Sequence, residues 1–207
     1  MAHKPKPPQA PPFSPAAERN RDAIAEQLRR LLPTQGMAVE VAAGTGQHAA
    51  HFAAQLPGWQ WLPSDGQAAS LLGIQAWCED LPNVRAPIWL DVLSPAWTGV
   101  PAQVDAVFCA NMLHIAAWPT CAALMAGSAR HLRPGGLLLV YGPFWADGQA
   151  PAPSNIEFDA DLRQRNAAWG LRSVAEVTQQ ATAHGLQLQE QAAMPANNLL
   201  LVFQHNT

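Results

Sequence analysis

The sequence predicts an α/β fold built on a doubly wound, mostly parallel sheet, and two patterns along the chain carry that prediction. Short apolar segments suited to strands alternate with longer segments that have helical spacing, an alternation typical of right-handed βαβ units. Several apolar segments, such as Leu-Leu-Leu-Val-Tyr at residues 137–141, run without a polar interruption. Such strands are expected in a parallel sheet because helices cover both of its faces.

Composition narrows the class of protein further. The 207 residues are 49% hydrophobic and 13% charged, with a formal net charge of −3, which suits one α/β core and not a generally basic nucleic-acid binder. No apolar stretch approaches the ~20 residues of a membrane span, and the N-terminus lacks the apolar run of a secretory signal. The three cysteines form no Cys-x-x-Cys pair, so neither disulfides nor a zinc knuckle is expected. We therefore expect a soluble, cytoplasmic protein.

The N-terminal end divides into a proline-rich arm and the start of the folded region. Residues 1–13 show no apolar periodicity, which predicts a disordered or polyproline-II arm; a solvated tail is favoured over a partner-binding segment. Residues 14–207 are expected to form one domain. Its first helix is predicted to begin at Ser14 and Pro15, because serine suits the N-cap and proline the first helical position. Pro33 ends that helix.

Seven strands and four further helices are expected in order after this first helix. The strands are predicted at residues 37–42, 59–63, 84–90, 104–110, 137–141, 186–193 and 199–204, and the helices at residues 47–56, 68–79, 118–132 and 173–184. Pro87 interrupts the third strand, which fits an edge or irregular strand. An Arg-Pro-Gly-Gly turn at residues 133–136 precedes the fifth strand, and Gly185 ends the last helix. Residues 142–171 are expected to be irregular.

The strongest functional signal is Glu-Val-Ala-Ala-Gly-Thr-Gly at residues 40–46. It lies at the first strand-to-helix turn, where doubly wound sheets bind nucleotides. Gly44 and Gly46 permit positive φ and the close approach of a ligand, and the helix N-terminus offers free N–H groups. Asp65 follows the second strand at about the 20-residue offset where an acid meets ribose hydroxyls, and Asp91 follows the third strand. These positions predict a nucleotide site at the carboxyl edge of the sheet.

Two nucleotide cofactors fit this turn. Residues 44–49 satisfy the Gly-x-Gly-x-x-Gly/Ala pattern of nicotinamide enzymes. Glu40 favours S-adenosylmethionine instead, because a carboxyl inside an apolar strand is costly unless paired, and the amino group of that cofactor offsets the cost. S-adenosylmethionine also has no pyrophosphate to cradle. An NAD-dependent oxidoreductase is therefore the less favoured alternative.

The nucleotide turn belongs to a longer series of motifs. Glu-x-Ala-x-Gly-x-Gly at residues 40–46, Asp65, Leu-Asp-Val at residues 90–92 and Arg-Pro-Gly-Gly at residues 133–136 occur in this order. The series resembles the class I S-adenosylmethionine-dependent methyltransferases. That resemblance implies a Rossmann-like, seven-stranded sheet of the class I methyltransferase type with an antiparallel last strand. It also implies that S-adenosylmethionine is the cofactor and S-adenosylhomocysteine the product.

The resemblance assigns roles to individual positions. Glu40 would support the methionine moiety indirectly, Asp65 would bind the ribose, and Asp91 would approach the adenine amino group with Val92 beside the ring. The remaining cofactor positions would be Ala42, Gly44, Thr45, Gly46, His48, Asn111 and Met112.

Six motifs narrow the resemblance to one small family. They are Ser-Pro-Ala-Ala-Glu-Arg-Asn at 14–20, Gly-Thr-Gly-Gln-His at 44–48, Asn-Met-Leu-His-Ile at 111–115, Tyr-Gly-Pro-Phe at 141–144, Ser-Asn at 154–155 and Met-Pro-Ala-Asn-Asn at 194–198. Together they resemble the methyltransferase-like protein 26 family, over nearly everything after residue 13. That family brings no settled substrate. Gly66 departs from its pattern, in which a larger residue follows the acid.

His114 and Tyr141 are the candidate catalytic residues. His114 follows the fourth strand, where class I methyltransferases face the transferred methyl, and a neutral imidazole can remove a proton; a hydrogen-bonded loop histidine is the alternative. Tyr141 is the only tyrosine and ends the fifth strand, a position from which it would orient a nucleophile. Residues 111–114 read Asn-Met-Leu-His rather than Asn-Pro-Pro-Tyr, which disfavours adenine and glutamine as acceptors.

Three segments are expected to contact the substrate. Residues 142–170 are too long for a plain connection, so we predict a lid over the substrate; a crossover packed by its aromatic side chains is the alternative. The first helix is expected to fold over the cofactor pocket, where Arg19 has the geometry of an anion contact. The predicted substrate-binding residues are Arg19, Asn20, Phe144, Asn155 and Asn197.

Metal, nucleic acid and membrane are not expected among the partners. His48 and His51 share a helical face, but no third ligand is evident. Lys and Arg are too few to form a basic surface along the phosphates of a nucleic acid. The acceptor is therefore expected to be a small molecule. A non-catalytic protein that binds S-adenosylmethionine or S-adenosylhomocysteine is the second function left open. The oligomeric state is left open between monomer and dimer.

Overall fold

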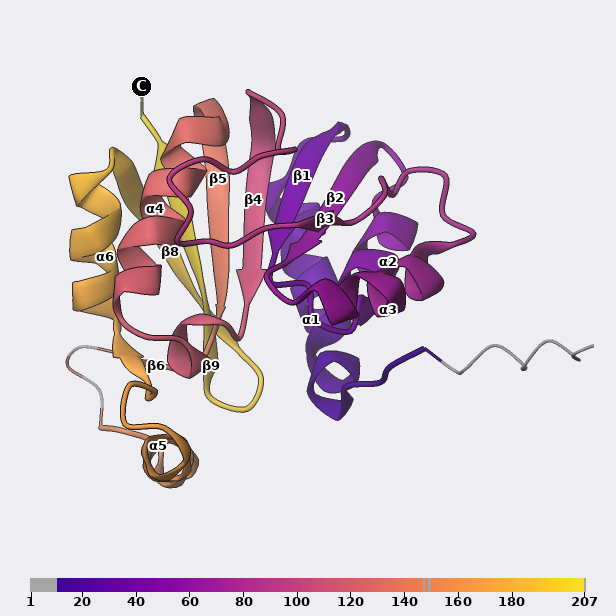
Figure 1. The fold of residues 1–207 in the computed structure, drawn as a ribbon. Helices are drawn as coiled ribbons and strands as arrows, with labels where there is room; N and C mark the ends of the chain where they lie inside the picture. The colour runs from indigo at the N-terminus through magenta and orange to yellow at the C-terminus, as the bar shows by residue number, and fades with distance from the viewer. Residues whose placement is uncertain (1–10, 147, 149, 207) are drawn as a thin grey trace, which may run out of the picture.

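The computed structural model describes residues 11–146, 148 and 150–206; most of the predicted proline-rich arm, residues 1–10, lies outside the described residues. A seven-stranded sheet in the order β3-β2-β1-β4-β5-β9-β8 forms the centre (Figure 1). β9 is antiparallel to both of its neighbours, whereas the other pairings described within this sheet are parallel. The predicted α/β fold, with a mostly parallel seven-stranded sheet and an antiparallel last strand, is confirmed.

The strands of this sheet follow the predicted order, and two of them differ in extent. They are β1 (Gly36–Val41), β2 (Trp59–Asp65), β3 (Ile88–Trp89), β4 (Val104–Ala110), β5 (Leu132–Gly142), β8 (Leu186–Met194) and β9 (Asn198–His205). The third strand was predicted over residues 84–90 but pairs only at β3 and at a single bridge from Trp61 to Val84, because Pro87 between them has no N–H to donate. β5 begins early because Leu132 already pairs with Val104.

Helices cover both faces of the sheet, as the uninterrupted apolar strands predicted. The helices are α1 (Pro15–Leu31), α2 (Gln47–Gln55), α3 (Ala68–Cys78), α4 (Pro119–His131), α5 (Pro153–Arg165) and α6 (Val174–Ala183). α1, α2 and α3 lie on one face, and α4 and α6 lie on the other (Figure 1). Within the described part of the chain, no helix is both long and apolar enough to cross a bilayer.

The helix starts follow the capping residues in the sequence. The hydroxyl of Ser14 accepts a hydrogen bond from the Ala17 N–H at 3.3 Å, and Pro15 occupies the first turn of α1. Ser173 forms a reciprocal capping box with Glu176 at the start of α6. Both starts match the prediction to within a residue.

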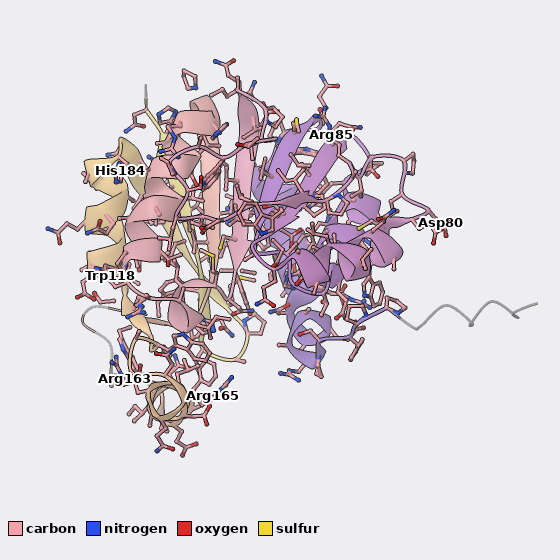
Figure 2. All side chains as sticks on the ribbon, in the orientation of Figure 1. Asp80, Arg85, Trp118, Arg163, Arg165 and His184 are labelled. Atoms are coloured by element: carbon pink, nitrogen blue, oxygen red, sulfur yellow. The ribbon has the colours of Figure 1, made fainter. Side chains whose placement is uncertain are left out.

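Residues 142–171 differ from the irregular segment that was expected. They contain α5 and the two-residue strand β6 (Phe144–Trp145), which pairs in parallel with β7 (Arg172–Ser173) in a second, small sheet. α5 lies below the carboxyl edge of the main sheet, where Figure 2 labels Arg163 and Arg165 on it. Its sequence is mostly polar, and Asn155 and Leu162 are its buried residues. The segment therefore lacks the repeated apolar spacing from which a helix is predicted.

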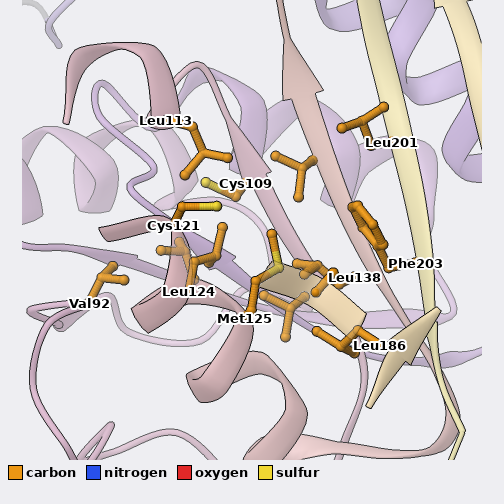
Figure 3. Close-up of a cluster of buried hydrophobic side chains, with 14 of the residues drawn as sticks. Val92, Cys109, Leu113, Cys121, Leu124, Met125, Leu138, Leu186, Leu201 and Phe203 are labelled. Carbon is orange, nitrogen blue, oxygen red and sulfur yellow. The ribbon is translucent and has the colours of Figure 1, made fainter. Parts of the chain in front are cut away.

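Two apolar clusters fill the space between the helices and the sheet. The cluster on the α4 and α6 side includes Cys109, Met125, Leu138 and Phe203 (Figure 3). The cluster on the other side is built around α1, α2 and the fully buried Trp61. Because both sheet faces are covered, the carboxyl edge is left as the place where polar side chains gather.

Gly127 in α4 lies against the ring of the buried Trp97. A methyl group at this position would lie 2.0 Å from Cζ2 of Trp97, so Gly127→Ala is expected to force a shift in the core and lower the free energy of unfolding by about 1–3 kcal/mol. Urea unfolding measures the change. Arg130→Ala, on the exposed side of the same helix, serves as the control with a smaller expected loss, and an unchanged midpoint for Gly127→Ala would contradict the packing argument.

Candidate functional site

Two adjoining cavities open at the carboxyl edge of the main sheet. The larger compartment has a volume of about 960 Å³ and the smaller one about 640 Å³. They share the residues that follow β1 and β4, namely Ala42, Gly44, Thr45, Ala110, Asn111 and Ile115. A ligand can therefore extend from one compartment into the other across the ends of these two strands, which is where open α/β sheets bind ligands.

Left-handed backbone turns shape the floor between the compartments. Ala42 and Asn111, each directly after a strand, both have φ of 57°, and Gly44 and Gly46 have φ of 59° and 89°. A non-glycine residue in this region costs about 1–3 kcal/mol and is concentrated at functional sites. The two turns bring backbone atoms of β1 and β4 close to the cavity. Asparagine tolerates this conformation well, whereas nothing in the sequence marks Ala42.

Asp65 lies at the end of β2, buried at the wall of the smaller compartment. One carboxylate oxygen accepts a hydrogen bond from the Gly44 N–H at 2.9 Å, and the other accepts from the Gln67 N–H at 2.8 Å. Each oxygen retains lone pairs for a further donor, so the carboxylate fits a vicinal diol in the cavity. The two predicted features, acid and glycine turn, are thus in direct contact.

The smaller compartment also contains the two residues predicted to meet the adenine, Asp91 and Val92, and a further predicted cofactor residue, Met112. An oxygen of Asp91 accepts a hydrogen bond from the Leu93 N–H at 3.0 Å, which fixes the carboxylate at the end of β3. The structure therefore brings these three residues and Asp65 around one cavity.

Two predicted cofactor residues lie behind the cavity walls that the structure describes. Glu40 is 1% exposed and accepts a hydrogen bond from the Trp61 indole N–H at 2.7 Å; burial raises the pKa of its carboxyl to about 8. Gly46 caps α2, and a Cβ there would lie 2.6 Å from the Cα of Ile74. Gly46 is thus explained by helix packing, and Glu40 by a contact inside the sheet.

The first and second motif segments meet at the start of α1 and α2. The Ser14 N–H donates to the side-chain oxygen of Gln47, and the Gln47 amide reaches Glu18 at 3.3 Å. His48 Nε2 lies 2.7 Å from Oδ1 of Asn20. Burial lowers the pKa of His48 to about 4, so this histidine is neutral near pH 7. These contacts hold α1 against the nucleotide turn.

His114 lies on a short 3-10 turn (Leu113–Ile115) and lines the larger compartment. Burial, followed by the nearby Arg172 guanidinium, lowers the pKa of His114 to about 4, and its ring meets Phe158 edge-on at 5.5 Å. Arg172 donates to the carbonyls of Leu113 and Ala116 at 3.1 and 2.7 Å and lies against Trp118, which Figure 2 labels. Arg172, which the sequence did not single out, thus fixes this turn.

α5 and the β8–β9 hairpin form the far wall of the larger compartment. The amide of Asn155 donates to the Asn197 carbonyl at 3.1 Å, and the amide of Asn197 donates to the Ser154 hydroxyl at 3.1 Å. Ala196 and Asn197 both have φ of 57°, as a type I′ hairpin turn requires. Asn155 and Asn197, predicted to bind substrate, therefore line this compartment as a linked pair.

The prediction that Phe144 binds substrate is not supported by its position. Phe144 is 5% exposed and packs in the cluster beneath α4 and α6. Phe158 of α5 is the aromatic residue of this segment that lines the larger compartment.

A family model described as a protein of unknown function, DUF938, matches residues 11–205. The chain belongs to this family. The finer resemblance to the methyltransferase-like protein 26 family stays a prediction.

Solved methyltransferases share the fold of this DUF938 chain. CalO1, a methyltransferase of calicheamicin biosynthesis solved with S-adenosylhomocysteine, is 20% identical with a TM-score of 0.70, over 87% of this chain and 54% of that chain. The S-adenosylmethionine-dependent methyltransferase SibL is 16% identical with a TM-score of 0.76, over 93% and 56%. The DUF938 chain thus spans about half the length of both.

A third solved structure matches the DUF938 chain over nearly its whole length. The complex between the Haloferax volcanii Trm112 methyltransferase activator and a methyltransferase contains a chain with 17% identity and a TM-score of 0.73, covered at 92% on both sides. At these identities the likeness establishes the fold.

Several residues of the DUF938 site were not foreseen from the sequence. Ser14, Ile115 and Pro143 line the larger compartment, and Pro12 lines the smaller one. Pro12 belongs to the predicted disordered or polyproline-II arm, and its carbonyl accepts a hydrogen bond from the Trp77 indole at 2.7 Å, so this residue of the arm contacts α3. Trp77 is partly buried on α3, and no local pattern in the sequence pairs it with Pro12.

Proposed function

We propose that this DUF938 protein is an S-adenosylmethionine-dependent methyltransferase with a small-molecule acceptor. One observation carries the proposal. The smaller compartment holds a buried acid at the ribose position, Asp65, and it continues into a larger compartment that contains His114. The two compartments are suited to a nucleoside and to an acceptor that meet above Asn111.

The residues of the smaller compartment fit the cofactor. Asp65 would accept hydrogen bonds from the ribose hydroxyls, and Asp91 with Val92 and Met112 would enclose the adenine. Ala42, Gly44 and Thr45, which both compartments share, would lie along the cofactor where it passes toward the larger compartment. When bound, S-adenosylmethionine supplies a methyl group on a sulfonium, an electrophile that needs no metal.

The larger compartment supplies the other requirements of methyl transfer. Its walls hold the acceptor against the methyl and exclude water, which lowers the barrier by positioning. His114 is neutral near pH 7 because its pKa is lowered to about 4, so its unprotonated nitrogen can accept a hydrogen bond from a hydroxyl or amine nucleophile, although burial makes it a weak base. α5 carries Ser154, Asn155 and Phe158 into this compartment, in the manner of the predicted lid over residues 142–170.

The acceptor is proposed to be a small molecule because the larger compartment is walled on several sides. α1, α5 and the β8–β9 hairpin surround it, which leaves a space of the size that small ligands occupy. A cytoplasmic location stays a prediction.

Calorimetric titration with S-adenosylmethionine, S-adenosylhomocysteine and NAD tests the cofactor. We expect the two sulfur ligands to bind and NAD not to bind. Asp65→Ala removes a buried charged acceptor, so it is expected to raise the Kd of S-adenosylhomocysteine about 10- to 100-fold. Asp80→Ala, in an exposed turn after α3 (Figure 2), is the matched control with an unchanged Kd.

The other outcomes are equally informative. Failure of both sulfur ligands to bind would exclude the proposal, and a positive NAD titration would then favour an oxidoreductase. Binding without any methylated product across a metabolite extract would favour the non-catalytic alternative. Thermal unfolding of Asp65→Ala guards against a folding defect, because Asp65 also accepts the Gly44 and Gln67 N–H groups.

A further inference from the structure

Four polar side chains from three elements line the larger compartment. Arg19 and Asn20 come from α1, His48 from α2 and Tyr141 from the end of β5, and all four line the compartment. Asn20, His48 and Tyr141 are each less than a tenth exposed. None of the described residues that line this compartment is an Asp or Glu, so no carboxylate of the protein competes for these groups there.

His48 holds the Asn20 side chain in place. Its Nε2 lies 2.7 Å from Oδ1 of Asn20, and its ring also hydrogen-bonds the backbone of Ala17. His48 is less than a tenth exposed, so these contacts fix the position of the Asn20 amide at the wall of the compartment.

Asn20 in turn contacts Tyr141, and both residues line the same compartment. A side-chain hydrogen bond with Asn20 lowers the pKa of Tyr141, against the larger, raising effect of burial. Asn20 therefore joins His48 to Tyr141 and positions the Tyr141 hydroxyl, a group that can donate to a ligand in the compartment.

Arg19 brings a charge to the same wall. The other three arginines of α1 each have a partner. Arg21 pairs with Glu18 at 2.6 Å, and Arg30 pairs with Glu190 at 2.6 Å. Arg29 donates to Gln55 at 2.7 Å. Within the described residues, Arg19 has no hydrogen-bonding or ion-pairing partner. A guanidinium that lines a cavity without a partner is a ready site for a planar anion.

We infer that Arg19 and Tyr141 form a carboxylate-binding subsite of the larger compartment, with Asn20 as the residue that positions the Tyr141 hydroxyl. The inference rests on the proposed function for the identity of the ligand. Two molecules could supply the carboxylate: the methionine end of the cofactor or an acidic acceptor. Arg19 provides the charge, and Asn20, held by His48, positions the hydroxyl of Tyr141.

Paired ligands that differ in the carboxylate test the first source. S-adenosylhomocysteine carries the methionine carboxylate, whereas 5′-methylthioadenosine keeps the nucleoside and lacks it. If the subsite holds the cofactor, Arg19→Ala and Tyr141→Phe raise the Kd of S-adenosylhomocysteine at least tenfold and that of 5′-methylthioadenosine less than twofold. Arg29→Ala, an exposed α1 arginine outside the compartment, is the charge-matched control with both Kd values unchanged.

Benzoate tests the second source. If the carboxylate comes from the acceptor, the variants leave both nucleoside ligands unchanged, and benzoate binds the protein saturated with S-adenosylhomocysteine but not its Arg19→Ala variant. If neither comparison depends on Arg19 and Tyr141, the subsite is excluded. If both nucleoside ligands fail to bind even the wild type, the proposed function fails, and benzoate binding to the ligand-free protein still decides whether the subsite exists.

A double-mutant cycle tests the positioning role of Asn20. Asn20→Ala is expected to weaken binding of the carboxylate ligand in the wild type and to add less than twofold in the Tyr141→Phe background, because its effect passes through the hydroxyl. Equal losses in both backgrounds would show that Asn20 is merely structural. Thermal unfolding of each variant separates a binding defect from a loss of the fold.

Discussion

Glu40→Gln is expected to stabilise the free protein by about 4 kcal/mol at pH 8 and to change its stability little at pH 4.5. Burial raises the pKa of Glu40 from 4.5 to about 8. Between these values the folded state binds more protons than the unfolded state, so stability falls as pH rises. Glutamine has no proton to lose and can still accept the hydrogen bond from Trp61, so the variant lacks this decline.

Urea unfolding of both proteins at pH 4.5, 6.5 and 8 measures the difference. The two stability curves should separate progressively as the pH rises. Glu26→Gln, an exposed carboxyl on α1, is the control and should follow the wild type. Parallel curves for the wild type and Glu40→Gln would show that Glu40 is already ionised in the folded protein.

The second large effect is expected at His48, through which the stability of the protein should fall as the pH is lowered. Burial lowers its pKa from 6.5 to about 4, so the unfolded state binds more protons between these values. Stability contributed by the neutral ring is complete above pH 6.5 and falls by about 3 kcal/mol as the pH drops to 4. His48→Gln keeps a donor for Asn20 and should lose that part of the acid sensitivity.

Comparison with His51 makes the test specific. Its pKa is also lowered by burial, but the Asp22 carboxylate at 3.0 Å acts in the raising direction, so His51→Gln should flatten the acid limb less than His48→Gln. Unfolding in urea at pH 7 and at pH 4.5 gives the two differences. An acid limb unchanged in His48→Gln would contradict the burial of a neutral ring.

The strand ends explain why much of the candidate site could be predicted from the sequence. In a parallel sheet, residues that follow successive strands meet at one edge, so the acid after β2 and the glycine turn after β1 were expected together. The structure joins them through the bond from the Gly44 N–H to Asp65. The same logic placed Asp91 and Asn111.

The parts that were not predicted depend on packing between distant segments. Phe144 and Phe158 are equally aromatic, and only the pairing of β6 with β7 decides that Phe144 is buried in the core while Phe158 lines the cavity. α5 has too few buried apolar residues to show a helical period. The hydrogen bond between His48 and Asn20 needs the contact of α1 with α2, which no local pattern contains.

The β8–β9 hairpin has a consequence for the order in which the site comes into existence. Residues 195–198 complete a compartment whose opposite wall is α1, and they are synthesised after every other part of it. When a nascent chain already contains the nucleotide turn at residues 40–46, the larger compartment still lacks the wall that the hairpin provides. Among the residues that the structure describes, the smaller compartment is lined only by those up to Thr120, so during synthesis the walls of the cofactor compartment exist before those of the acceptor compartment are complete.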